Sequence, residues 1–118
     1  MLTELGKELR KLRIERDERI LDMADKIDKS SAFISAVETG RKAPPAGFEE
    51  VIIKAYGLAA SVAAAIRSAA DKSRKAFTIE PTTPLGRDTA GLLARRMNNL
   101  TDEQLEEIKG ILRRGHDE

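Results

Sequence analysis

The sequence contains no cysteine, no tryptophan and one histidine, and aromatic residues make up 3% of its 118 residues. Without cysteine, the chain has no disulfide framework, no thiolate zinc site and no cysteine nucleophile. The single histidine, His116, stands near the end of the sequence, where it cannot supply a histidine metal site or a general base by itself. We therefore expect no enzymatic activity, no catalytic residues, no metal and no cofactor.

Long hydrophobic runs and an N-terminal signal peptide are also missing. No segment approaches the roughly 18 consecutive apolar residues that would span a membrane. We therefore expect a soluble, cytoplasmic protein with no membrane partner, and the lack of cysteine fits a reducing cytosol. The length fits one domain of ordinary size, or a small domain with an appendage.

An excess of charge of one sign is missing as well, since 21 Lys and Arg stand against 20 Asp and Glu. The charge is distributed unevenly, however. Residues 1–78 hold 15 basic and 12 acidic residues, whereas residues 79–118 hold 6 and 8. A mildly basic N-terminal part is thus followed by an acidic C-terminal part. Pronounced nucleic-acid footprints are more basic than this, so charge alone does not indicate DNA binding.

The spacing of apolar residues predicts an all-α chain. Five helices are expected over residues 3–16, 20–27, 30–39, 48–56 and 61–75, with glycines or prolines after several of them. Residues 78–88 contain two prolines and no helical period, which predicts an extended linker. Phe77–Glu80, at its start, are compatible with a short strand. Two further amphipathic helices are expected over residues 89–99 and 101–114, the second opened by a capping box at Thr101 and Gln104.

The segment between Met23 and Glu38 is interpreted as two short helices joined by a turn of three or four residues. Its apolar positions would hold the two helices together, and Ala24 is small where the second helix crosses closely. Such a unit can place its second helix in a DNA major groove, which is about 12 Å wide. An ordinary corner between two helices of a small bundle has the same periodicity, so the periodicity leaves both interpretations open.

The order of residues resembles the phage Cro/repressor-type helix-turn-helix regulators, also called the xenobiotic-response-element-like family. The matching pattern lies between Leu5 and Leu58 and includes Leu9-Arg10-x-Leu12-Arg13, Met23-Ala24-x-x-Ile27 and Ile34-Ser35-x-Val37-Glu38-x-Gly40-Arg41-Lys42-x-Pro44. The resemblance implies a five-helix repressor-like DNA-binding domain whose recognition helix begins near Ser30. Longer regulators of this type append a small helical C-terminal element.

The resemblance also implies roles for individual residues. Base edges would be contacted by four small side chains of the recognition helix, which we call the reading face: Ser31, Ala32, Ser35 and Ala36. Phosphates would be contacted at the start of that helix and in the loop after it, by Ser30, Arg41 and Lys42. A structural ion pair linking the first helix to the end of the third would be formed by Arg13 and Glu38.

Three departures from the family pattern bear on these roles. Ile20 stands where a glutamine often opens the second helix and touches DNA, so that contact is in doubt. Asp28 stands where the turn commonly has a glycine, although Asp tolerates left-handed backbone better than most residues. Serine and alanine lack the bidentate discrimination of Arg or Gln, so specificity is either modest or depends largely on DNA shape.

The two C-terminal helices predict a helical hairpin over residues 89–118, which the 78–88 linker separates from a DNA-binding domain over residues 1–77. Isolated helices of about a dozen residues are marginally stable, so these two must pack on the domain, on each other or on a second subunit. We expect a dimerisation element that uses the apolar residues Leu92, Leu93, Met97, Leu105, Ile108, Ile111 and Leu112. The alternative is a hairpin folded back on its own domain.

Together these patterns predict a sequence-specific transcriptional regulator of a bacterium or prophage. We expect a repressor that binds double-stranded DNA at a palindromic operator as a homodimer. The alternative is an antitoxin that autoregulates its promoter while its C-terminal element binds a toxin partner. An enzyme is disfavoured because adjacent carboxylates such as Glu49 and Glu50 diverge on a helix rather than converge on a substrate.

Overall fold

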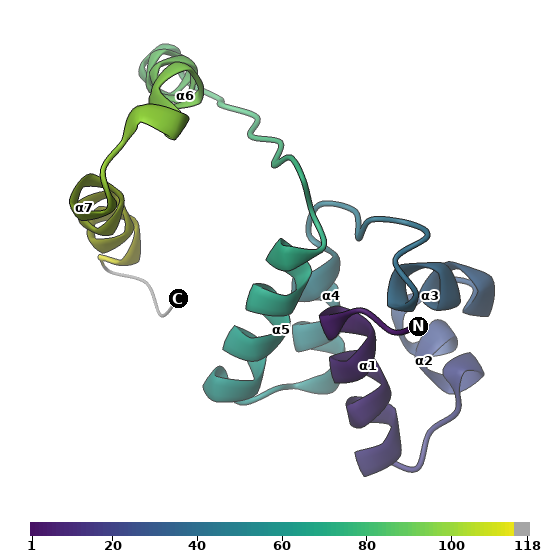
Figure 1. Cartoon of the computed structure of the whole chain (residues 1–118). Coiled ribbons are helices and arrows are strands. Elements are labelled where there is room, and N and C mark those ends of the chain that lie inside the picture. Colours follow the sequence, from purple (N-terminus) through teal and green to yellow (C-terminus); the bar gives the residue numbers. More distant parts are fainter. Residues whose placement is uncertain (115–118) are drawn as a thin grey trace. The chain divides into compact units, whose positions relative to one another are not determined.

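The structure is a computed structural model that describes residues 1–114. The last four residues of the predicted hairpin, 115–118, lie outside the described part, and His116 is one of them. The described chain consists of helices α1 (Glu4–Glu15), α2 (Ile20–Ile27), α3 (Ser31–Glu38), α4 (Phe48–Tyr56), α5 (Ala60–Lys72) and α6 (Pro84–Arg96), the 3-10 helix η1 (Met97–Asn99), and α7 (Asp102–Arg113) (Figure 1). The all-α prediction is confirmed. The chain divides into two compact units after Phe77, which we call unit 1 and unit 2.

Short-range hydrogen bonds define most helix ends close to where the sequence predicts them. The Ser30 side chain caps α3 by accepting a hydrogen bond from the Phe33 amide at 3.0 Å. Asp28 ends α2 in a left-handed conformation with φ 56° and ψ 48°, which Asp adopts at lower cost than most residues. Thr101 and Gln104 form a reciprocal capping box at the start of α7. These ends are predictable because each cap involves residues only a few positions apart.

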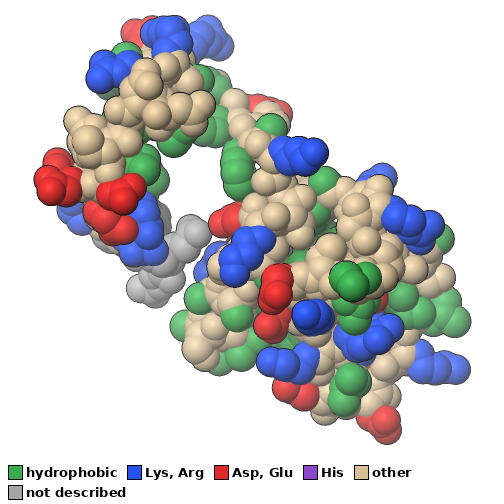
Figure 2. Space-filling view, in the orientation of Figure 1, with side chains coloured by type: hydrophobic (Ala, Val, Ile, Leu, Met, Phe, Trp, Pro, Cys, Tyr) green, Lys and Arg blue, Asp and Glu red, His purple; other side chains and the backbone are tan. Residues whose placement is uncertain are grey.

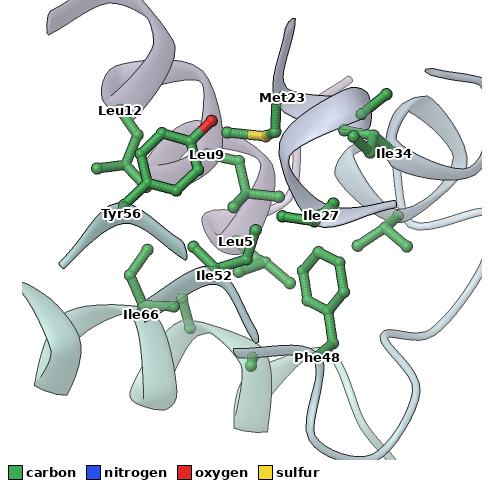
Figure 3. Packing of buried hydrophobic residues seen from close by; sticks show 14 residues of the cluster. Leu5, Leu9, Leu12, Met23, Ile27, Ile34, Phe48, Ile52, Tyr56 and Ile66 are labelled. Carbon is green, nitrogen blue, oxygen red and sulfur yellow. The ribbon is translucent and has the colours of Figure 1, made fainter. Parts of the chain in front are cut away.

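Unit 1 encloses a hydrophobic core to which all five of its helices contribute (Figure 3). The most deeply buried large side chains are Leu5, Leu9, Met23, Ile34, Val37, Ile52 and Ile66. Because α2 and α3 have only eight residues each, packing in this core rather than intrinsic helix propensity stabilises them. The alanine-rich α5 covers the core mainly through Ile66, since alanines bury little apolar area.

In unit 2, by contrast, no residue of α6 or α7 is buried. Four of the apolar residues expected to mediate dimerisation are exposed, namely Leu92, Met97, Ile111 and Leu112, and three are half-buried, namely Leu93, Leu105 and Ile108. The short helix η1 and the extended Leu100 separate α6 from α7. Within the described residues of one chain, the predicted hairpin therefore has no buried interior to stabilise its two helices.

The prediction for the start of α6 is wrong. We expected a linker as far as residue 88, but the helix begins at Pro84, and the Thr83 side chain caps it by accepting from the Gly86 amide at 2.9 Å. Proline at the first helical position loses no intrahelical hydrogen bond, so Thr-Pro starts a helix rather than prolonging a linker. The strand considered at Phe77–Glu80 is also wrong, since these residues have no regular secondary structure.

Candidate nucleic-acid interface

Helices α2 and α3 form a helix-turn-helix unit with a sharp, hydrogen-bonded turn. The Lys29 amide donates to the Ala24 carbonyl at 3.0 Å, which closes the turn at Asp28. The inner sides of both helices belong to the core of unit 1. On α3 the reading face is accessible: Ala32 is exposed, and Ser31, Ser35 and Ala36 are half-buried. Its small side chains allow the α3 backbone to approach another surface closely.

The first turn of α3 provides donors for an anion. Ser30 is exposed, and its hydroxyl oxygen is occupied by the Phe33 amide, while the Ser30 carbonyl accepts from the Ile34 amide at 3.2 Å. The amides of Ser31 and Ala32 precede the first intrahelical bond, so they are orphan donors at the positive end of the helix dipole. A phosphate oxygen is the ligand that such a helix start favours.

The loop after α3 presents two exposed basic side chains, Arg41 and Lys42. The Lys42 amide donates to the Ala36 carbonyl at 3.1 Å, which holds the start of the loop against the end of α3. The Arg41 Nε donates to the Thr39 hydroxyl at 3.2 Å. The end of α3 thus holds Lys42 through its backbone amide and Arg41 through its side chain.

Two lysines contact the ring of Phe33, which lies on α3. Both the Lys29 and the Lys42 ammonium nitrogens lie 5.5 Å from the centroid of the half-buried Phe33 ring, within the range of a cation–π interaction. The Phe33 ring itself packs on Phe48 with a centroid separation of 5.8 Å. Lys29 is not among the predicted phosphate contacts. Its position immediately before the helix cap, Ser30, is the sequence signal that could have identified it.

Glu38, at the C-terminal end of α3, is held to α1 through both its side chain and its backbone. The Arg13 guanidinium forms an ion pair with the Glu38 carboxylate, with Nη2 to Oε1 at 3.2 Å, and the two side chains are only 8% and 4% exposed. The Arg13 Nη1 also lies 3.5 Å from the Met23 sulfur. The Thr3 amide and hydroxyl both donate to the Glu38 carbonyl, at 2.9 and 3.2 Å. These contacts set the orientation of α3 relative to α1.

A second polar cluster joins the α1–α2 connection to the end of α4. The Tyr56 hydroxyl donates to the Glu18 carboxylate at 2.7 Å, and the Lys26 ammonium donates to it at 2.5 Å. These two hydrogen bonds, the one from Lys26 foremost, lower the pKa of Glu18 below its ordinary value. Burial, followed by the hydrogen bond to Glu18, raises the pKa of Tyr56. The Lys26 ammonium also lies 4.4 Å from the Tyr56 ring centroid, so α2 is attached to α4 by charge and by ring contact.

Unit 2 has a different electrostatic character from the basic loop of unit 1. Four carboxylates gather on the first turns of α7, which Figure 2 shows as a red cluster: Asp102, Glu103, Glu106 and Glu107. Acidic residues stabilise a helix N-terminus through its dipole. The same residues repel anions such as phosphate, whereas the exposed Arg41 and Lys42 of unit 1 attract them.

A family model described as a helix-turn-helix domain matches residues 4–75, which is more than half of the chain. The chain therefore belongs to the helix-turn-helix domain family, and this membership supports a DNA-binding regulator. No curated protein and no solved structure matches the chain. Among the residues that the structure describes, no helix is long and apolar enough to cross a membrane.

Proposed function

We propose that this protein is a sequence-specific transcriptional repressor of the Cro/repressor-type, xenobiotic-response-element-like subclass, and that unit 1 binds operator DNA with α3 in the major groove. This proposal depends on one observation: α3 is accessible and is surrounded by groups that suit contact with DNA. Its reading face is accessible, its N-terminus has two orphan amides, and basic side chains stand at both of its ends. Such a helix combines base contact with phosphate contact in a single surface.

The chemistry of the reading face defines the kind of sequence preference we expect. The hydroxyls of Ser31 and Ser35 can donate to or accept from several base edges, and the methyl groups of Ala32 and Ala36 suit a thymine methyl. None of these side chains makes a bidentate contact. Phosphate contacts by Ser30, Arg41 and Lys42 then fix the register, and the shape of the DNA supplies part of the specificity.

Unit 2 is proposed to join two copies of the chain, so that two α3 helices bind two half-sites. Helices of 13 and 12 residues without buried side chains need a partner surface for stability. Their charges fit a second copy: α6 ends in Arg95 and Arg96, whereas α7 begins with Asp102 and Glu103. In a two-fold dimer, contact between α6 of one copy and α7 of the other occurs twice and pairs opposite charges each time.

The direct test is selection of bound sites from random duplexes by the purified full chain. We expect two half-sites related by two-fold symmetry, with centres about 10 base pairs apart or a multiple of that spacing. Variants with a bulky residue at Ser31 or Ala36 should select a different half-site. A bulky residue at Lys54, which is exposed near the end of α4, should select the original one. Failure to enrich any site, or an unchanged site when Ser31, Ser35 and Ala36 are all enlarged, would refute the proposed role of α3.

The exposed apolar residues of unit 2 also favour a second candidate function, the antitoxin of a toxin–antitoxin pair. In that case a toxin, rather than a second copy, would cover residues such as Leu92 and Leu112, which are 54% and 69% exposed. Purification of the full chain from its native cells distinguishes the two. A stoichiometric partner that is toxic when expressed alone indicates the antitoxin, whereas a homodimer without such a partner indicates the repressor.

A further inference from the structure

Arg74, two residues after the end of α5, binds the loop between α3 and α4. Its Nε donates to the Pro44 carbonyl at 3.1 Å, and its Nη2 donates to the Pro45 carbonyl at 2.7 Å. The same guanidinium forms a bidentate pair with the Glu49 carboxylate, with Nη1 to Oε2 at 2.9 Å and Nη2 to Oε1 at 2.7 Å. The side chains of Arg74 and Glu49 are only 10% and 13% exposed, so solvent screens this arrangement less than it screens a surface ion pair.

These contacts complete the anchoring of the loop that carries Arg41 and Lys42. At its start, the Lys42 amide is bonded to the Ala36 carbonyl. At its end, the two prolines have no amide hydrogen, so their carbonyls are the backbone groups through which this part of the loop can be held. Pro44 is itself buried. A single residue, Ala43, separates Lys42 from the segment that Arg74 holds.

We propose that Arg74 is a positioning residue for DNA binding, which holds the loop in the conformation that presents Arg41 and Lys42 to phosphates. This inference rests on the proposed function of unit 1. A loop that is already ordered in the free protein does not lose its conformational freedom when DNA binds. Without Arg74, that ordering must occur on binding, and the DNA affinity should fall roughly tenfold, an effect comparable to ordering one backbone residue.

The chain contains a suitable control for the loss of a link between α5 and α4. Arg67, on α5, forms a bidentate pair with Glu50, with both nitrogen–oxygen distances at 2.8 Å. The pair has the same chemistry as that of Arg74 with Glu49, and the two glutamates are neighbours on α4. Arg67→Ala therefore reports what losing an arginine–glutamate link between these elements does to DNA binding.

The experiment compares the full chain with its Arg74→Ala, Arg74→Lys and Arg67→Ala variants. Each of these four backgrounds is also combined with Lys42→Ala and, separately, with Lys29→Ala. Affinity for a duplex carrying the selected site is measured over a range of salt concentrations, at a temperature where circular dichroism shows each variant to be folded. Arg74→Lys keeps a charge for Glu49 but lacks the planar fork that serves two carbonyls and a carboxylate. It therefore supplies the test if Arg74→Ala does not fold.

We expect both Arg74 variants to bind more weakly and with a flatter salt dependence, and we expect Lys42→Ala to cost less affinity in them than in the wild type. Lys29→Ala, at the other end of α3, should cost the same in every background, and Arg67→Ala should bind like the wild type. Folded Arg74 variants with wild-type affinity and an undiminished Lys42→Ala effect would overturn this inference alone. A wild-type chain that binds no duplex would instead overturn the proposed function on which it rests.

Discussion

Gly6 in α1 lies directly against the backbone of Glu38 at the end of α3, so that a Cβ atom at position 6 would stand 2.2 Å from the Glu38 carbonyl oxygen. That oxygen cannot move away freely, because it accepts hydrogen bonds from the Thr3 amide and hydroxyl. The close approach of the two helices therefore requires a residue without a side chain. It also fixes where α3 ends relative to α1.

Gly6→Ala should destabilise unit 1 by about 3 kcal/mol, because overpacking against backbone exceeds the roughly 1 kcal/mol that alanine gains in a helix. Denaturant unfolding followed by circular dichroism measures this change. Gly110→Ala, in α7, is the matched control, since nothing lies within 4 Å of the added Cβ, and it should cause no loss of stability. A Gly6→Ala variant as stable as the wild type would contradict the observed packing.

Removing one partner of the buried ion pair should cost more than removing both. Arg13→Met or Glu38→Leu alone leaves a buried charge unpaired and should lower the free energy of unfolding by about 3–5 kcal/mol. The double variant Arg13→Met with Glu38→Leu should lose less than either single change, because no charge is left in the core. A double-mutant cycle on unfolding free energies measures the coupling. Additive losses would show that the two side chains do not interact.

The stability of unit 1 should fall as the pH drops through the acid range. The Arg74 guanidinium lowers the pKa of Glu49 below the ordinary value of 4.5, and Lys26 and Tyr56 do the same for the pKa of Glu18. A depressed folded-state pKa stabilises the fold above the unfolded-state pKa, and this stabilisation is lost as the pH falls through the folded-state value.

Glu18→Gln combined with Glu49→Gln should therefore flatten the dependence of unfolding free energy on pH below about pH 4.5, the ordinary glutamate value. Urea unfolding at several pH values provides the measurement. Glu106→Gln is the control, because the Glu106 side chain in α7 is 71% exposed. This substitution should leave the pH profile of unit 1 unchanged. A double variant with the wild-type pH profile would rule out these two carboxylates as its source.

Lys29→Ala and Lys42→Ala should each weaken binding to all duplexes alike and reduce the slope of log affinity against log salt by about one. The reason is that each ammonium, placed beside Phe33 near α3, is expected to neutralise one phosphate. Lys54→Ala should leave the slope as it is, since Lys54 is an exposed lysine near the end of α4. If Lys29→Ala and Lys42→Ala both kept the wild-type slope, Lys29 and Lys42 would be excluded as phosphate contacts.

The full chain should form dimers that a chain of residues 1–77 does not form. Unit 1 has its own core, so the shortened chain should remain folded and monomeric in analytical ultracentrifugation at micromolar concentration. In the full chain, Leu92→Asp with Ile111→Asp should also give monomers, since both residues are exposed in a single chain, at 54% and 58%, and are expected at the dimer contact. Monomeric wild-type protein, or dimers of residues 1–77, would contradict dimerisation through unit 2.

Local chemistry explains which parts of the fold could be predicted from the sequence. The capped start of α3 at Ser30, the left-handed turn at Asp28 and the capping box at Thr101 each depend on residues within a few positions of one another. The start of α6 depends on equally local residues, Thr83 and Pro84. The sequence pattern places this start too late, because a proline can either end a helix or begin one. The absence of a helical spacing of apolar residues does not tell a linker from the first turn of a helix.

The pattern of residues along the chain predicts seven helical segments and the core-facing sides of the first five. The order of these residues also shows a likeness to helix-turn-helix regulators. Three long-range contacts come instead from the packing of the helices: Gly6 against Glu38, Tyr56 with Glu18, and Arg74 with Pro44, which is 30 positions away. Caps and periodicity are properties of neighbouring residues, whereas these contacts depend on the crossing angles and distances of packed helices. Such angles follow from the shape of the whole core, and they decide which polar groups from distant parts of the chain meet.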